Sequence, residues 1–434
     1  MPTQPKPRHD HQTLKFPKGF LWGTATSAFQ VEGNNINADW WSWEQKAQPP
    51  SKRSGKAANE YALFEKDFDL AKELGQNTHR LSIEWSRIEP TEGQINLEEI
   101  EHYKKVLKAL KDQGFSVMLT LHHFTNPVWF AQKGGWESAE AVDYFEKYIK
   151  MVVPEFKDYV DFWITINEPS IYVFMGFLLG AWPPNKKSKW STLKVYNNLV
   201  QAHKKSYRII HDLVPKAQVG IANSVSSFEN FHHHSLLEDI VEWGLDLGTN
   251  HLFYQLSGMD THDFLGVNYY FNRYISLNGE AILPSIVDVS QIKQDISDQG
   301  WEIYPPGIFN ALVDLSDYHK PIYVTENGIA STNDDRRVRF LLNYLNEIYH
   351  AIKVGVDVRG YYHWSLIDNY EWIDGYDARF GLIEVDFKNQ RRTPRPSAYV
   401  YKEIIENNGI PHKLLRLLGH GMHHKIKRGH IVTT

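Results

Sequence analysis

The stretch "YVDFWITINEPSIY", residues 159–172, contains the strand that best indicates the fold of this chain. Residues 160–168 are rich in strand-forming side chains, and the run ends at Asn167, Glu168 and Pro169. A short apolar run of this kind is typical of a parallel strand that helices cover on both faces. A carboxylate at the tip of a buried strand calls for a chemical explanation, because an unpaired buried charge is unstable.

Strands of the same kind alternate with helical patterns along the chain. Strands are predicted at 20–27, 77–85, 115–124, 160–168, 217–224, 263–270, 321–327 and 357–366. Helices are predicted at 59–75, 96–114, 139–156, 191–213, 235–256, 307–319, 335–354 and 397–407. Eight strand–helix units in one chain predict an α/β fold with a single (β/α)8 TIM barrel.

The barrel is predicted to span residues 14–411, between two polar ends. Residues 1–13 are interpreted as a disordered N-terminal lead and residues 412–434 as a basic C-terminal tail with five Lys or Arg, five His and no acid. Three interpretations of the tail stay open: a disordered end, a short amphipathic helix docked on the barrel, or a peripheral contact with a membrane surface. The histidines at 232–234 and 423–424 could bind a metal adventitiously but are interpreted as solvated loop residues, and the predicted site contains no metal.

Composition excludes several classes of function. The 434 residues carry a net charge of −5, which gives no field for nucleic acid, and no cysteine, which excludes disulfides and thiol nucleophiles. The 14% aromatic content fits either a large core or rings that line a sugar-binding cleft. The N-terminus has no apolar signal-peptide region and no run of about 18 apolar residues exists, so a cytoplasmic location without a transmembrane segment is expected. A homo-oligomer is left open.

Two carboxylates are expected at the mouth of the barrel. Active sites of such barrels lie at the C-terminal ends of the strands, and Glu168 and Glu326 end the fourth and seventh strands. A pair of acids in one cleft can hydrolyse a glycosidic bond, although each could instead form a local salt bridge. Burial and the second acid should raise the pKa of Glu168, and Pro169 should hold its backbone at a defined angle. Arg80 is the expected cation that keeps Glu326 ionised.

The chain resembles glycoside hydrolase family 1, the retaining β-glucosidase and β-galactosidase family, over residues 16–407. The motifs that carry the resemblance are "FPKGFLWGTATSAFQVEG" (16–33), "HRLSIEWSRIEP" (79–90), "LHHFTNPVW" (121–129), "TINEP" (165–169), "LGVNYY" (265–270), "VTENG" (324–328) and "HWSLIDNYEWIDGYDARFGLIEVD" (363–386). They occur in the family's order. The resemblance implies the (β/α)8 barrel and an enzyme without a cofactor.

The resemblance also implies roles for individual residues. Glu168 corresponds to the general acid/base and Glu326 to the nucleophile. Substrate-binding positions are Gln30, His123, Asn167, Tyr270, Trp364, Glu371, Trp372 and Phe380, and nucleophile support comes from Arg80, Asn268 and Tyr270. Trp364 and Trp372 could instead be core residues, and only the register of "HHF" selects His123 over His122. Glu32, Glu84 and Asp368 are expected to be structural.

Some positions depart from the usual family pattern. Phe124 and Trp182 stand where many members have Trp and His, and Ser170 where a Trp often begins the leaving-group site. Several loops are short, similar to archaeal members, which leads to the hypothesis that bulky or alkyl leaving groups are accepted. An anionic Glu371 is expected to repel a 6-phosphorylated sugar.

The predicted activity is hydrolysis of terminal non-reducing β-D-glucosyl residues, with β-galactosyl and fucosyl residues also expected, by double displacement. The partners would be small-molecule β-glycosides or short oligosaccharides. The two acids should lie about 5–5.5 Å apart. Two alternatives stay open: an enzyme that transfers the sugar to an alcohol or another sugar, and a catalytically silent glycan-binding barrel. The sequence does not select the preferred sugar.

Overall fold

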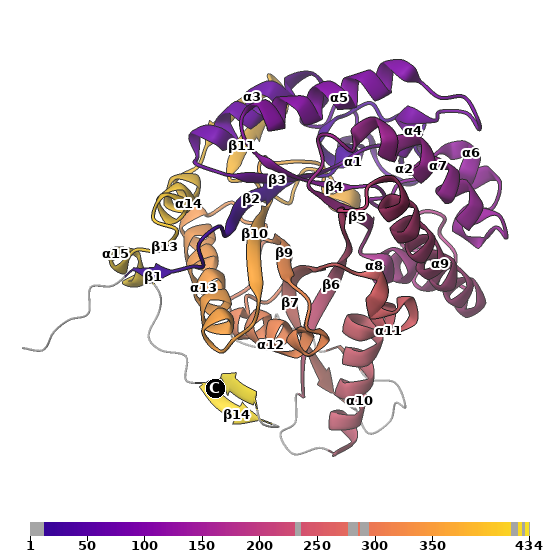
Figure 1. Ribbon diagram of the computed structural model, residues 1–434. Coiled ribbons are helices and arrows are strands. Elements are labelled where there is room, and N and C mark those ends of the chain that lie inside the picture. Colours follow the sequence, from indigo (N-terminus) through magenta and orange to yellow (C-terminus); the bar gives the residue numbers. More distant parts are fainter. Residues whose placement is uncertain are drawn as a thin grey trace, which may run out of the picture.

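The computed structural model describes residues 13–230, 236–276, 285–286, 295–417, 424–427 and 430–433. Eight parallel strands close into a barrel through the β10–β2 and β6–β7 pairs (Figure 1). They are β2 (Leu21–Ala25), β3 (Thr78–Ser82), β4 (Ser116–Thr120), β5 (Phe162–Asn167), β6 (Gln218–Asn230), β7 (Leu265–Ser276), β9 (Ile322–Asn327) and β10 (Val358–Trp364). The predicted (β/α)8 barrel is confirmed. The histidines at 232–234 and 423 and residues 1–12 of the predicted lead lie outside the described residues.

Helices surround the barrel, as Figure 1 shows. The larger ones are α3 (Glu60–Glu73), α5 (Leu97–Asp112), α7 (Ala141–Phe156), α9 (Lys189–Leu213), α10 (Leu236–Asp246), α12 (Pro305–Leu315), α13 (Asp334–Lys353) and α14 (Pro396–Glu406). Asn96 and Asn333 cap α5 and α13, because each side chain accepts hydrogen bonds from the first free N–H groups. Across the described ranges, no helix is both long and apolar enough to cross a membrane.

The structure corrects two predicted elements. The helix expected at 235–256 is interrupted by a π-helical turn at Leu247–His251, so that α10 is followed by the separate helix α11 (Leu252–Ser257). Strands β6 and β7 run beyond residues 224 and 270, where they were expected to end, and stay paired as far as Asn230 and Ile275. Both corrections concern one side of the barrel mouth.

Two apolar layers follow from the side-chain pattern of the strands. Side chains that point into the barrel, among them Met118, Ile164 and Phe264, form an inner cluster. Side chains that point outward pack against the helices in a larger cluster. Because both faces of the sheet are covered, strands that are apolar along their whole length are stable here. Polar side chains that reach the solvent or a ligand are therefore found mainly at the strand ends.

Short elements follow the strands at the C-terminal ends and build the mouth. They are α1 (Ala28–Val31), α2 (Asp39–Ala47), α4 (Trp85–Ile88), α6 (Val128–Gln132), α8 (Pro169–Val173) and the strand pair β11 (Ile383–Asp386) and β12 (Arg391–Pro394). The motifs singled out in the sequence therefore fall on this face.

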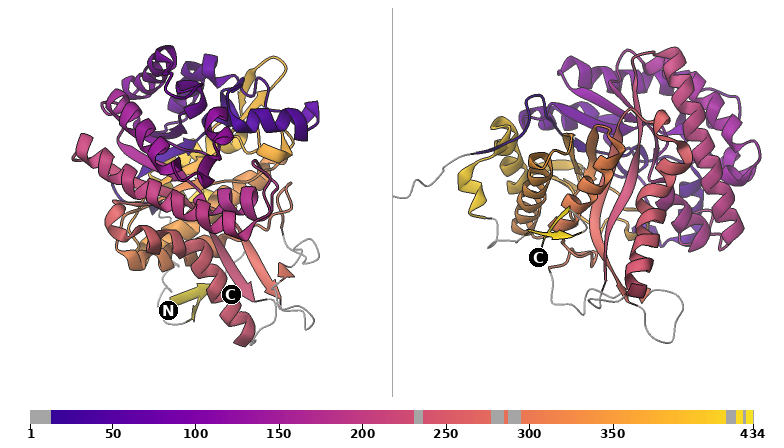
Figure 2. Two further views of the ribbon diagram at one scale, coloured as in Figure 1. Left: turned by 90° about the vertical axis from the view of Figure 1, so that its right-hand side faces the viewer. Right: turned by 60° about the horizontal axis from the view of Figure 1, so that its bottom comes forward.

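The two ends of the barrel meet. Strand β1 (Leu14–Lys15) pairs antiparallel with β13 (Gly409–Ile410), and Asn408 bonds to Phe16 and to the indole of Trp22. The tail continues as α15 (His412–Leu415) and a hairpin of β14 (His424–Lys427) and β15 (His430–Thr433), which lies beside α12 (Figure 2). None of the three interpretations of the tail included a hairpin.

Candidate active site

A cavity of about 640 Å³ lies at the C-terminal ends of the strands. This volume lies within the range of small-molecule sites. Ten residues predicted from the sequence line it: Gln30, His123, Asn167, Glu168, Tyr270, Glu326, Trp364, Glu371, Trp372 and Phe380. The two other predicted residues, Arg80 and Asn268, are buried behind the lining.

Glu326 is held by a cation and a phenol. Nη1 of Arg80 lies 2.5 Å from Oε1 of Glu326, and the hydroxyl of Tyr270 donates to Oε2 at 2.6 Å. Both charged side chains are almost fully buried, at 1% and 5% exposure. A charge-assisted pair of this geometry is stronger than a neutral hydrogen bond and holds the carboxyl group in place. The next residue but one, Gly328, lacks the Cβ that would overlap the carbonyl oxygen of Trp364.

The backbone of Glu168 has a defined but unusual conformation. Residues before proline normally adopt an extended conformation. Glu168 instead has φ 43° and ψ 57°, in the left-handed region. Its N–H donates to Ala222 at 2.7 Å and its carbonyl accepts from Tyr172 at 3.0 Å, so strand β6 and helix α8 fix the conformation from both sides. Such backbone strain is typical of functional positions.

The electrostatic environment of Glu168 differs from that of Glu326. Burial raises the pKa of Glu168, and the neighbouring charge of Glu326 raises it further, to about 8. The hydrogen bond from Asn268 and the charge of Arg80 oppose this shift. The raised pKa of Glu168 predicted from the sequence is confirmed. Glu168 is therefore mainly protonated near pH 7, a state suited to proton donation.

A chain of buried polar side chains connects the two acids. Nη2 of Arg80 donates to Oδ1 of Asn167 at 2.7 Å, and Nδ2 of Asn268 donates to Oε1 of Glu168 at 2.9 Å and lies 3.1 Å from the same Asn167 oxygen. Because Oδ1 of Asn167 faces two donors, its Nδ2 is directed toward His123, at 3.3 Å from Nε2. The amide therefore presents a donor to the cavity.

The opposite side of the cavity carries Gln30 and Glu371. Nε2 of Gln30 lies 3.2 Å from Oε2 of Glu371, and Ser27 donates to Oε1 of Gln30 at 2.7 Å. Burial, followed by the charges of Asp374, Glu326 and Glu168, raises the pKa of Glu371 well above its usual value. This favours the neutral carboxyl group in the free site, so the expected repulsion of a sugar phosphate by an anionic Glu371 is not supported.

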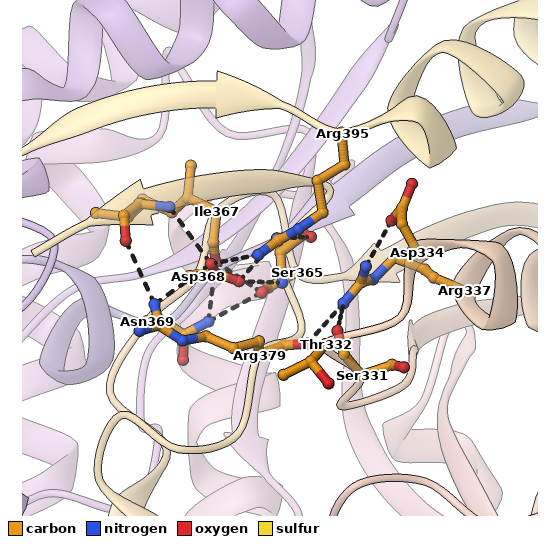
Figure 3. Close-up of polar contacts among 12 residues, drawn as sticks. Ser331, Thr332, Asp334, Arg337, Ser365, Ile367, Asp368, Asn369, Arg379 and Arg395 are labelled. Carbon is orange, nitrogen blue, oxygen red and sulfur yellow. Dashed lines mark hydrogen bonds and ion pairs between the residues drawn. The ribbon is translucent and has the colours of Figure 1, made fainter.

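Figure 3 shows the buried network that supports this side. The carboxylate of Asp368 pairs with Arg395 at 2.8 Å and accepts from the backbone of Gly381 at 3.0 Å. The next residue, Asn369, donates to Ser365 at 2.9 Å and accepts from Nε2 of Gln30 at 3.1 Å. Asp368 therefore has the structural role expected from the sequence.

Aromatic rings form the remaining wall. The ring of Trp364 lies nearly parallel to that of His123, with centroids 6.2 Å apart. The two departures from the usual pattern contact each other, because the rings of Phe124 and Trp182 lie 5.0 Å apart and both pack against Trp372. A larger residue at 182 thus fills the space beside a smaller one at 124.

The histidine pair is separated by the structure. His123 lines the cavity, whereas Nε2 of His122 lies 3.0 Å from Oδ1 of Asn126, outside the lining. Burial lowers the pKa values of both rings, that of His122 to about 4. A neutral His123 can donate to a hydroxyl group from one ring nitrogen.

Several lining residues were not identified from the sequence. They include Ile171, Phe174, Met175, Phe271, Arg273 and Trp301. Trp301 precedes α12 in a segment without a motif, and its ring lies 5.8 Å from Tyr270 and 6.3 Å from Phe380. The only signal in the sequence for Met175, Phe271 and Arg273 is that they follow Glu168 or Tyr270 closely along the chain.

One cluster within the described ranges brings three potential metal ligands within 4.8 Å of one another: Asp246, His251 and Asp314. Nε2 of His251 lies 2.5 Å from Asp314 and 3.5 Å from Asp246. Burial alone would lower the pKa of His251, but the hydrogen bonds to both carboxylates raise it to about 11. The protonated ring therefore pairs with both carboxylates, and the cluster is outside the cavity lining.

A closed barrel with paired buried acids in a sugar-sized cavity defines a glycoside-cleaving enzyme. The model of glycosyl hydrolase family 1 matches residues 12–242 and 252–410, and the chain belongs to this family. Beta-glucosidase A of Acetivibrio thermocellus is 32% identical over 92% of this chain and 99% of its own. Beta-galactosidase of Pyrococcus woesei is 30% identical over 92% and 98%. The structure of a beta-glycosidase from Pyrococcus horikoshii is 38% identical, with a TM-score of 0.88 over 94% and 99%. The chain is thus a β-glucosidase-type glycosyl hydrolase.

Proposed function

We propose that the protein is a retaining β-glycosidase that works by double displacement. Glu326 attacks the anomeric carbon while Glu168 gives its proton to the leaving oxygen, which departs as an alcohol. Glu168, now a carboxylate, removes a proton from water, and the resulting attack releases the sugar with its β-configuration and restores Glu326. The unequal environments of the two acids carry this assignment: Arg80 and Tyr270 bind Glu326, whereas Glu168 has a pKa of about 8.

We place the sugar in the part of the cavity between the acids and Gln30, because hydrogen-bonding groups and rings line it there. Gln30 and Glu371 offer hydrogen-bonding groups to the hydroxyls far from the scissile bond, and the amide of Asn167 offers a donor to the 2-hydroxyl. Trp364 forms the apolar floor, with Phe380 beside it and Trp372 and His123 along the wall. Glucosides are the expected substrates, with galactosides and fucosides as further candidates.

Covalent labelling tests the proposal. An activated 2-deoxy-2-fluoro-β-glucoside should raise the intact mass by one fluoroglucosyl group, and peptide mapping should locate it on Glu326. The fluorine slows both steps, while the good leaving group lets the first one proceed. Labelling at another carboxylate would overturn the assignment. Turnover with release of the α-anomer would overturn the retaining mechanism. No labelling and no turnover of any β-glycoside would support the silent barrel.

Transfer to an alcohol uses the same residues and is the second candidate. It is favoured only by the apolar cavity described below, which can place an alcohol beside Glu168. At high acceptor concentration, an excess of released leaving group over free sugar would reveal transfer. Equal amounts would show hydrolysis alone.

A further inference from the structure

A second cavity, of about 370 Å³, lies next to the catalytic cavity. It is bounded by α8, the beginning of α9, the π-helical turn after α10, and the parts of β6 and β7 that extend beyond the barrel. Its lining is mainly apolar and includes Val173, Leu178, Leu193, Phe228, Leu252 and Ile275. We call it the apolar groove.

The apolar groove borders the catalytic cavity. The side chains of Ile171, Phe174 and Arg273 line both spaces. Helix α8, which supplies Ile171, begins directly after Glu168. The groove therefore opens on the side of the acid that would protonate the leaving oxygen, and it lies away from Gln30 and Glu371.

The chemistry of the lining selects an apolar occupant. Among the lining residues that the structure describes, Arg273 is the one that carries a charge. Its guanidinium lies over the ring of Phe271, 4.7 Å from the centroid, near the border of the two cavities. Leu193 and Leu178 remain 63% and 37% exposed at the groove. Exposed apolar side chains around an apolar space indicate a surface that binds an apolar ligand.

We infer that the apolar groove holds the alkyl chain of the leaving group, so that long-chain alkyl β-glycosides are preferred substrates. This inference rests on the proposed function and specifies its substrate class. Burial of each methylene group should increase kcat/KM by roughly fourfold at most until the groove is filled. Because the chain contacts the same surface before and during the reaction, KM should fall with chain length while kcat changes little.

A glycine pair supplies matched variants. Gly248 lines the groove, and a Cβ there would meet no atom within 4 Å. Gly244, four residues earlier, has the same free space but does not line the groove. Gly248→Leu therefore fills the groove without a backbone clash, and Gly244→Leu is its control. Leu193→Glu, at an exposed position, places a charge in the groove and serves as a second test if Gly248→Leu folds poorly.

The experiment measures kcat/KM for methyl, butyl, hexyl and octyl β-glucosides below their aggregation concentrations. The natural chain and Gly244→Leu should gain at least tenfold from butyl to octyl, mostly through KM. Gly248→Leu and Leu193→Glu should lose most of this gain. A flat series in the natural chain would overturn the inference, as would an undiminished gain in both groove variants.

Two further outcomes separate the alternatives. Cleavage of methyl and nitrophenyl β-glucosides with a flat alkyl series would sink the groove inference and leave the proposed function intact, whereas no cleavage of any glycoside would remove the proposed function itself. Sedimentation of the same variants identifies a rival occupant. A dimer that Leu193→Glu dissociates, with no change in the alkyl series, would assign the groove to a second copy of the chain.

Discussion

Asn268 donates a hydrogen bond to the carboxyl group of Glu168, at 2.9 Å between Nδ2 and Oε1. The orientation of the Asn268 amide is fixed, because Thr325 donates to its Oδ1 at 2.7 Å. A buried donor of fixed position stabilises the carboxylate form of its acceptor. Asn268 therefore limits how far burial and Glu326 raise the pKa of Glu168.

Replacement of Asn268 by alanine should move the basic limb of the pH–rate profile to higher pH. The lost hydrogen bond had favoured the ionised form, so the pKa of Glu168 rises and the acid stays protonated further into the alkaline range. The measurement is kcat/KM against pH with an alkyl glucoside. Asn272→Ala removes another buried asparagine of β7, which contacts Glu302 instead, and should leave the limb in place. A limb that moves down in Asn268→Ala would contradict the assignment.

The natural enzyme should lose kcat/KM as pH rises through about 8, because Glu168 then gives up the proton that the leaving group needs. Glu168→Gln should abolish this basic limb and lower kcat/KM for alkyl glucosides by roughly 10²–10⁴-fold. Dinitrophenyl glucosides leave without a proton, so their first step should be much less affected. Equal losses for both substrates would argue against an acid role.

The same pKa predicts how stability depends on pH. Glu168 ionises near 4.5 in the unfolded chain and near 8 in the folded one. Its contribution to stability is thus complete below about 4.5 and is lost progressively as pH rises through 8. In thermal unfolding, the Tm of the natural chain should fall relative to that of Glu168→Gln as pH rises from about 4.5 to about 8. A constant difference in Tm across this range would refute the shift.

Loss of one hydroxyl group should weaken the support of Glu326. Tyr270→Phe removes the 2.6 Å hydrogen bond to Oε2 and should lower kcat/KM by about 10–100-fold, the usual effect for a bond to a charged group. Tyr269→Phe changes the neighbouring residue, whose hydroxyl contacts the backbone of Tyr304 at 3.3 Å. That control should stay within about threefold of the natural enzyme. Similar losses in both variants would point to a general disturbance of β7.

Gly328→Ala should disable the site by steric conflict. The new methyl group would overlap the carbonyl oxygen of Trp364, which must move together with its ring. Overpacking of this kind costs about 1–3 kcal/mol or more of stability. We expect a lower Tm together with a large rise in KM for glucosides. Gly244→Ala, with open space around its Cβ, is the control, and an active, fully stable Gly328→Ala would contradict the contact.

Most of the barrel and the acids could be predicted from the sequence because they rest on local signals. Apolar strands and amphipathic helices alternate with little ambiguity, and Glu168 and Glu326 stand at strand ends inside motifs. The raised pKa of Glu168 followed from its apolar surroundings and its partner. Arg80 could be paired with Glu326 because a buried strand arginine needs an anion.

What could not be predicted depends on contacts between distant segments. The left-handed backbone of Glu168 is imposed by Ala222 on the neighbouring strand, which overrides the preference that Pro169 sets locally. The compensation between Phe124 and Trp182 joins residues 58 positions apart (182 − 124), and neither residue alone signals it. The residues that extend β6 and β7 and bound the apolar groove show no hydrophobic periodicity in the sequence. A strand could therefore not be distinguished from a loop there.

The pairing of β1 with β13 has a consequence for biosynthesis. A ribosome releases Leu14 long before Gly409, and β2 likewise waits for its partner β10. Until residues 358–364 emerge, β2 keeps an unpaired edge that can join other chains. Trp364 and Glu371 arrive with that last strand and the loop after it, so the catalytic cavity is completed only after nearly the whole chain has left the tunnel. A nascent or truncated barrel would therefore be prone to aggregate through β2 before its catalytic cavity could bind a substrate.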